Sequence, residues 1–140
     1  MYKDLRKESF RGNVEYGKWL IATMVAVHGG ALYALNTLRS AAPGLPSDRH
    51  SLLLEAASWH VAGIVLVLIA GFMGWLNFGY AAQHYDRWAE PGMMRRTDMW
   101  PKNSGTRDPI GATYVLAICA GLGSGFSLIA GATAALKAIS

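Results

Sequence analysis

The chain has almost no cysteine and no familiar catalytic motif. Its 140 residues contain a single cysteine, Cys119, which excludes an intrachain disulfide and any metal site built from several thiolates. The H-E-x-x-H pattern of zinc hydrolases is missing, and so is a nucleophile with a base in a known motif. GLGSG at 121–125 follows no predicted strand and is therefore no dinucleotide fingerprint. These absences leave thiolate-metal, hydrolytic and dinucleotide-binding roles without support in the sequence, and no nucleic-acid partner is expected.

Charge is absent from three long stretches. Twenty residues between Lys18 and Arg39, thirty between Glu55 and Asp86, and twenty-eight between Asp108 and Lys137 carry no formal charge. A helix of about 20 apolar residues crosses a hydrocarbon core of roughly 30 Å, so each stretch is long enough to span a membrane. The sequence predicts an all-α integral membrane protein with three transmembrane helices and a short amphipathic helix at its amino terminus.

The distribution of cations predicts the orientation. Lys and Arg are retained on the cytoplasmic side during insertion. Ten of the 13 Lys and Arg residues fall in the amino-terminal arm and the loop between the second and third spans, and three (Arg39, Arg49 and Lys137) fall on the other side. We therefore expect a cytoplasmic amino terminus, an outer carboxy terminus and a bacterial cytoplasmic (inner) membrane as the location.

Prolines, glycines and charges mark the expected segments of a single membrane domain, 1–140. A cleaved signal peptide is disfavoured for the first span, because the apolar segment is longer than a usual signal core and Pro43 would follow the cut. Ser47 or Asp48 is expected to cap the second helix, and Pro109 suits the first turn of the third. The segments are an interfacial arm (1–18), a first span (19–38), an outer loop (39–52), a second span (53–82, extending to about 90), a cytoplasmic loop (91–109) and a third span (110–136).

Small residues recur every four positions on two spans. Lipid tails are as apolar as leucine, so helices in a bilayer associate where small side chains let their backbones approach closely. The pattern predicts helix-packing surfaces, either within one subunit or between subunits, at Ala22, Ala26, Gly30 and Ala34 on the first span and at Ala117, Gly121 and Gly125 on the third.

Polar side chains within the spans are the candidate functional residues: His28, Asn36, His60 and Asn77. At about 100° per residue His28 lies roughly 160° from Gly30, on the bulky face with Ile21, Met24, Leu32 and Leu35. Hydrogen bonding across helices and a pore position in an oligomer both remain open. The sequence disfavours a proton relay, because the apolar cores contain no Asp, Glu, Lys or Arg.

Haem ligation by His28 and His60 is the alternative cofactor hypothesis; otherwise no cofactor or metal is expected. Haem can be held between two helices by axial histidines. His28 lies near the middle of its span and His60 near the outer end of the second span, which predicts an offset of about 8 Å along the membrane normal. Such an offset disfavours a shared iron.

The cytoplasmic loop combines tryptophan with cations, and we expect it to dock on anionic lipid or a protein partner. Cations near the inner leaflet contribute about 1 kcal/mol each, and tryptophan anchors at the interface. The residues concerned are Trp88, Arg95, Arg96, Trp100 and Lys102. Together these patterns predict a non-enzymatic protein that acts by helix assembly, as a homo-oligomeric pore or membrane-perturbing module. The alternative is an accessory or anchor subunit of a larger respiratory-type membrane complex.

Overall fold

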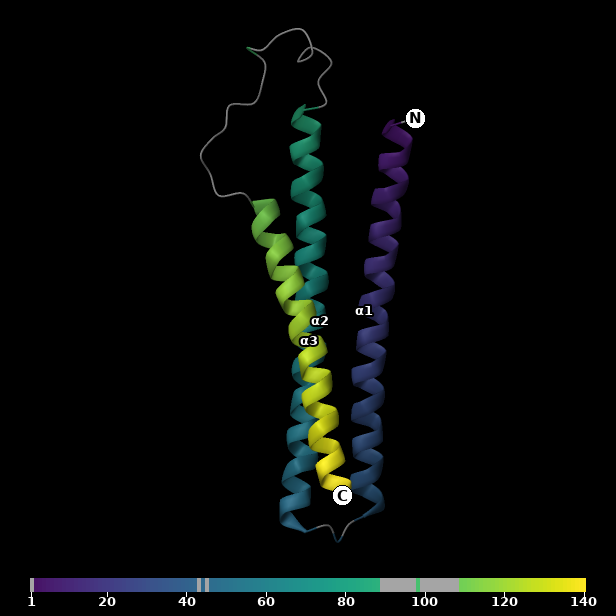
Figure 1. Ribbon diagram of the computed structural model, residues 1–140, viewed down its shortest axis with the longest axis vertical. Helices are drawn as coiled ribbons and strands as arrows, with labels where there is room; N and C mark the ends of the chain where they lie inside the picture. Colours follow the sequence, from purple (N-terminus) through teal and green to yellow (C-terminus); the bar gives the residue numbers. More distant parts are fainter. Residues whose placement is uncertain (1, 43, 45, 89–97, 99–108) are drawn as a thin grey trace.

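The computed structural model is a bundle of three helices, with no strand among the residues that it describes: 2–42, 44, 46–88, 98 and 109–140. The helices are α1 (Tyr2–Ala41), α2 (Ser47–Trp88) and α3 (Pro109–Ile139). They run alternately up and down (Figure 1). The amino terminus and the end of α2 therefore share one end of the bundle, and the turn between α1 and α2 lies at the other end, near the carboxy terminus.

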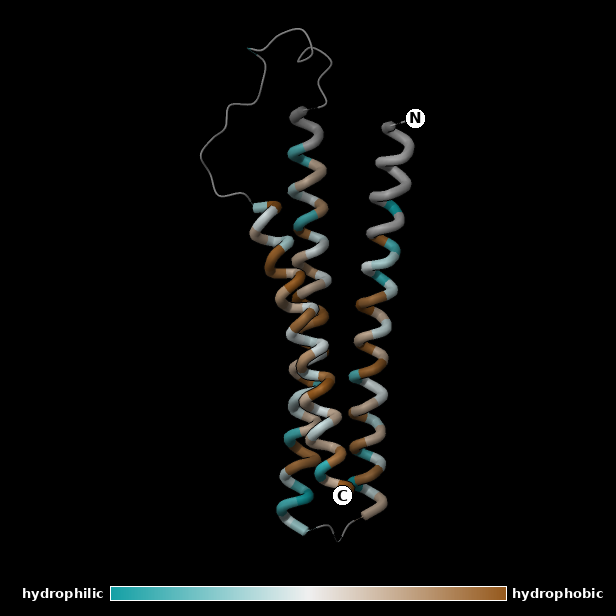
Figure 2. Tube along the Cα trace, viewed as in Figure 1, coloured by the Kyte–Doolittle hydropathy of each residue, from teal (hydrophilic) through white to brown (hydrophobic). Residues whose placement is uncertain are grey.

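Each helix is long and apolar enough to cross a bilayer. The qualifying segments are Val14–Ala41, Ser47–His84 and Pro109–Ile139, with mean hydropathies of 1.3, 2.1 and 1.9. α3 alone, with 31 residues, extends about 46 Å, against a hydrocarbon core of about 30 Å. Hydrophobic residues run along the middle of all three helices (Figure 2). The all-helical class with three candidate spans is confirmed, and it indicates an integral membrane location.

Large apolar side chains cover the outside of the bundle. Leu122, Ile129 and Phe126 are 72%, 67% and 63% exposed. In water such surface would cost roughly 25 cal/mol per Å², whereas hydrocarbon tails contact it without that penalty. The surface chemistry thus agrees with the helix lengths in favouring a lipid environment.

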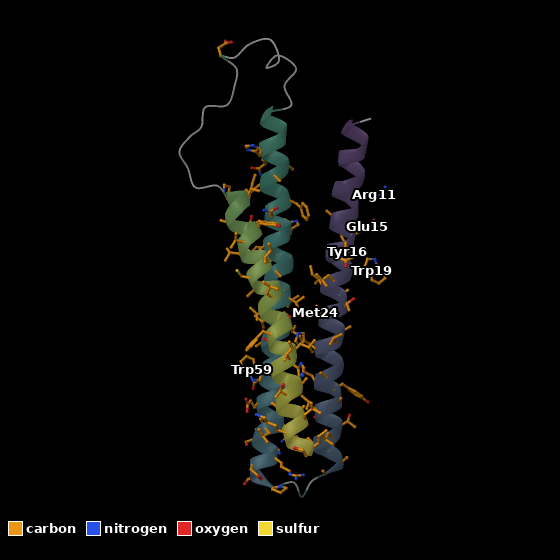
Figure 3. The ribbon with its side chains drawn as sticks, viewed as in Figure 1. Arg11, Glu15, Tyr16, Trp19, Met24 and Trp59 are labelled. Carbon is orange, nitrogen blue, oxygen red and sulfur yellow. The ribbon has the colours of Figure 1, made fainter. Side chains whose placement is uncertain are left out.

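α1 is one continuous helix of 40 residues. The separate short helix predicted for residues 1–18 is therefore wrong. Gly12 and Gly17 each disfavour helix by about 1 kcal/mol relative to Ala, but this cost does not stop an established helix from propagating. Tyr16 and Trp19, both 75% exposed, lie near the start of the apolar segment Val14–Ala41 (Figure 3), where amphipathic rings favour the membrane interface.

The starts of α2 and α3 agree with the turn chemistry of the sequence. α2 begins at Ser47 with Asp48 in its first turn, where a carboxylate interacts favourably with the helix dipole. The backbone N–H of His50 donates to the carbonyl of Pro46 at 3.0 Å, so the cap residue is Pro46, one position before the predicted Ser47 or Asp48. α3 begins at Pro109. The N–H groups of the first helical turn have no carbonyl partner within the helix, and proline has no N–H that would need one.

α2 and α3 form the main packed pair, while α1 lies against α2 and scarcely touches α3 (Figure 1). The apolar core lies near the α1–α2 turn and consists of Leu35, Leu53, Ala56, Ala134 and Ala138. Only one face of α1 is thus covered, and the rest of that helix is available to lipid or to another helix.

Candidate functional site

A buried polar cluster joins all three helices. His28 of α1, His60 of α2 and Ser124 of α3 are 0%, 2% and 0% exposed, and they are the largest fully buried side chains among the residues described. Polar groups in a membrane interior must be satisfied by protein partners, because lipid offers none. We name this group the His–His–Ser cluster.

His28 occupies the centre of the cluster. Its Nδ1 lies 3.1 Å from Nδ1 of His60, and its Nε2 lies 3.1 Å from Oγ of Ser124. A neutral imidazole carries one N–H. If the Nδ1–H of His28 donates to His60, its Nε2 accepts from the Ser124 hydroxyl; if its Nε2–H donates to Ser124, its Nδ1 accepts from His60. Both patterns satisfy the central ring completely.

Two glycines make room for the imidazole rings. A Cβ added to Gly63 would overlap the ring of His28, lying 2.7 Å from its Nδ1, and one added to Gly131 would lie 2.8 Å from Nε2 of His60. Distances below 3.0 Å force a neighbour to move, and here the neighbours are rigid buried rings. Gly63 and Gly131 are therefore part of the cluster, although neither belongs to the small-residue stripes predicted from the sequence.

The face predicted for His28 is confirmed. Leu35 on the same face is buried, and Ile21, Met24 and Leu32 are partly buried. The ring of His28 lies against the second and third spans, where it contacts His60 and Ser124. Lipid is excluded as its environment by its complete burial.

The predicted difference in depth between His28 and His60 is wrong. His28 lies 13 residues before the end of α1 at Ala41, and His60 lies 13 residues after the start of α2 at Ser47. Both are therefore about 20 Å from the shared turn. The predicted offset was measured within the apolar spans 19–38 and 53–82, whereas both helices extend beyond these spans to the shared turn.

The geometry nevertheless does not fit haem. Two imidazole nitrogens across one iron would be separated by about 4 Å, twice a typical metal–imidazole bond. The observed separation is 3.1 Å, and the rings are inclined at 65° with centroids 5.3 Å apart. The spaces beside the rings are closed by the helices carrying Gly63 and Gly131. The cluster accordingly has no gap between its imidazoles for a porphyrin.

Ser124, His28 and His60 have the order of a nucleophile, a base and an orienting group. The sequence motifs did not suggest this arrangement, because the three residues come from three different helices. Acyl transfer also needs a substrate carbonyl about 3 Å from the nucleophile and from donors to its oxyanion. Ser124 has no exposed surface. The arrangement forms a hydrogen-bonded link among the three helices.

Asn77 forms a second polar link at the other end of the α2–α3 pair. Its Nδ2 donates to the carbonyl of Ile110 at 2.6 Å and to Oγ1 of Thr113 at 2.9 Å. Asn36, the remaining polar candidate, is exposed and lies apart from both links. The structure thus joins two of the four polar candidates, His28 and His60, and places the other two elsewhere.

The two small-residue stripes differ in their surroundings. Ala22, Ala26, Gly30 and Ala34 are all exposed, on the side of α1 away from His28. On α3, Ala117, Gly121 and Gly125 are partly buried, and a Cβ at either glycine would meet nothing within 4 Å. Neither stripe supplies the closest contacts within the subunit.

The buried face of α3 follows a different pattern. Strict spacing by four drifts about 40° per step around a helix, whereas alternating steps of three and four remain on one face. This alternating spacing is the feature of the sequence that indicates which residues of α3 are buried. The buried residues that follow it are Thr113, Ala120, Ser124, Ser127, Gly131, Ala134 and Ala138.

The predicted docking loop lies outside the described residues. This applies to Arg95, Arg96, Trp100 and Lys102, and to the side chain of Trp88 at the end of α2. Within the described part of the chain no group of three or more His, Cys, Asp or Glu residues could hold a metal ion. Cys119 is exposed on α3.

No protein-family model matches the chain, and neither a curated protein nor a solved structure matches it.

Proposed function

We propose that this protein is a non-enzymatic assembly module of the bacterial cytoplasmic membrane that associates with further copies of itself through α1. The observation that carries the proposal is the exposure of Ala22, Ala26, Gly30 and Ala34, here named the small-residue face. It extends about 18 Å along the apolar part of α1. A surface of this kind supports close contact between helices in lipid.

The His–His–Ser cluster supports the same proposal by setting the rotation of α1. His28 points roughly 160° away from Gly30, and its two hydrogen bonds hold that side against α2 and α3. Turning the small-residue face inward would break both bonds and leave polar groups in hydrocarbon, where each unsatisfied group costs several kcal/mol. The cluster thereby keeps the small-residue face directed outward.

Self-association is favoured because the small-residue face is compatible with its own copy. In a twofold-symmetric dimer the same patch of both subunits meets, and Gly30 between alanines at four-residue spacing allows two α1 helices to approach closely. The sequence assigns the cations of the arm and the second loop to the same, cytoplasmic side, where they favour anionic lipid.

Membrane perturbation has more support than conduction through a pore. His28 and His60 bond to each other and Asn77 bonds to α3, so three of the four polar candidates are directed into the subunit. Only the exposed Asn36 is available to a path between subunits. An accessory or anchor subunit of a larger complex is the second candidate, since the small-residue face can also receive a helix from a different protein.

Single-molecule photobleaching in nanodiscs or vesicles tests the proposal. We expect the wild type to be oligomeric, and Gly30→Leu to raise the dissociation constant about tenfold or more, because a bulky side chain separates the backbones. Ala132→Leu is the matched control, since Ala132 is also an exposed small residue but lies on α3. A wild type that is monomeric alone but is pulled into a hetero-complex would favour the accessory subunit. A Gly30→Leu variant that is as oligomeric as wild type would exclude the small-residue face as the surface of self-association.

A further inference from the structure

A groove separate from the His–His–Ser cluster runs between α2 and α3 on the outside of the bundle. Its volume is about 350 Å³, and its lining comes from one face of each helix. Trp59 lies in it on the side of the α2–α3 pair that is away from α1 in Figure 3. The lining residues are Leu52, Glu55, Trp59, Phe126, Ile129, Ala130, Thr133, Ala134 and Lys137.

Opposite charges stand at one end of this groove. The contact between His60 and Gly131 gives a common level for α2 and α3. From that level Glu55 lies five residues, or about 8 Å, toward the α1–α2 turn, and Lys137 lies six residues, or about 9 Å, in the same direction. Both side chains are exposed, and neither forms an ion pair with another residue in the described part of the chain. The two helices thus present a carboxylate and an ammonium at the same height.

The remainder of the groove is apolar and aromatic. Trp59 and Phe126 meet edge to face, with ring centroids 5.9 Å apart and an interplanar angle of 81°. Phe126 lies 11 residues from Lys137 along α3, so the groove extends about 16 Å from its charged end toward the middle of the bundle. Ile129 is 67% exposed beside it. A charged end and a long apolar body, parallel to the helices, match the shape of a lipid.

We propose that this groove binds a zwitterionic phospholipid with a primary ammonium, of the phosphatidylethanolamine class. Glu55 accepts hydrogen bonds from the ammonium, Lys137 donates to the phosphate, and one acyl chain lies over Trp59, Phe126 and Ile129. An anionic headgroup satisfies Lys137 but is repelled by Glu55. A quaternary ammonium has no N–H to donate to the Glu55 carboxylate, so the phosphatidylcholine class binds less well. This site is independent of self-association through α1.

Native mass spectrometry of the purified full chain tests the site. The protein is mixed with equal amounts of phosphatidylethanolamine, phosphatidylglycerol and phosphatidylcholine that carry identical acyl chains. We expect wild type to retain phosphatidylethanolamine about fivefold better than either competitor, the effect of one partly exposed charge contact of about 1 kcal/mol. Glu55→Gln should abolish this preference, and Lys137→Gln should weaken retention of all three lipids. Both residues are exposed, and circular dichroism checks that the variants remain helical.

Asp48→Asn is the matched control, because Asp48 is an exposed carboxylate on α2 outside the groove. It should retain lipids as wild type does. Soluble phosphoethanolamine distinguishes a site for the headgroup alone from a site for the lipid: we expect it not to displace the bound lipid. Equal retention of the three lipids by wild type, or an unchanged preference in Glu55→Gln, would overturn the proposal. Displacement by phosphoethanolamine alone would reassign the groove to a soluble ligand.

Discussion

At the scale of single residues, the central feature is an imidazole held entirely by protein groups. The bonds of His28 to His60 and Ser124 connect three helices, although hydrogen bonds between membrane helices contribute only about 0.6 kcal/mol on average. These bonds matter more for setting the rotation of α1 than for their strength, because His60 and Ser124 lose their partner when α1 is rotated. The two glycines beside the rings are as necessary as the polar atoms.

We predict that Gly63→Ala destabilises the bundle. The added Cβ would overlap the ring of His28, and overpacking of a well-packed core costs about 1–3 kcal/mol. The measurement is the free energy of unfolding in mixed micelles, followed by circular dichroism. Gly74→Ala is the control on the same helix, since a Cβ there would meet nothing within 4 Å; it should be neutral or slightly stabilising. Equal effects of the two substitutions would contradict the close contact of His28 with Gly63.

At the scale of the helix, the two asparagines provide a matched comparison. Asn77 donates to Ile110 and Thr113 across the α2–α3 contact, whereas Asn36 is exposed and its side chain bonds to no residue in the described ranges. We predict that Asn77→Leu lowers the free energy of unfolding by about 1 kcal/mol and Asn36→Leu leaves it nearly unchanged. Thermal unfolding in the same detergent measures both. A larger loss for Asn36→Leu would show that its environment differs from the one described.

The positions of the helices could be predicted from the sequence because they follow from local chemistry. Gaps in charge mark the spans, and Pro109 stands at the start of α3. The continuity of α1 through Gly17 could not be predicted, because a glycine lowers helix propensity without deciding whether the helix ends. Local patterns thus indicate which residues form helices more reliably than they indicate where each helix stops.

The neighbours across helices were harder to predict. The face of His28 follows from helical periodicity, but its pairing with His60 depends on the depth at which α1 and α2 pack against each other. The spacing on α3 places Ser124 on the buried face, but it does not indicate a bond to His28, because serines in helices commonly bond their own preceding turn, as Ser127 does to the carbonyl of Gly123. Lateral contacts between helices depend on register, which a single sequence does not display.

At the scale of the whole molecule, the arrangement of the ends makes the proposed orientation testable. Gly44 lies in the α1–α2 turn, at the opposite end of the bundle from the amino terminus. In a Cys119→Ala background we predict that an impermeant maleimide labels Gly44→Cys in intact cells and leaves Lys18→Cys unlabelled until the membrane is opened, because Lys and Arg favour the cytoplasmic side. The reverse pattern of labelling would show that the orientation in the membrane is opposite to the proposed one, with the same bundle of helices.

The unbroken length of α1 has a mechanical consequence. Forty residues extend about 60 Å, so roughly half of the helix lies beyond a hydrocarbon core of about 30 Å. A torque applied to the part of α1 beyond the hydrocarbon core is transmitted to His28, because the helix is unbroken between them. The imidazole of His28 and the small-residue face lie on opposite sides of the same continuous helix. A rotation of α1 that moves one of them therefore moves the other as well. Such a rotation must break the hydrogen bonds of His28 before the small-residue face can change direction.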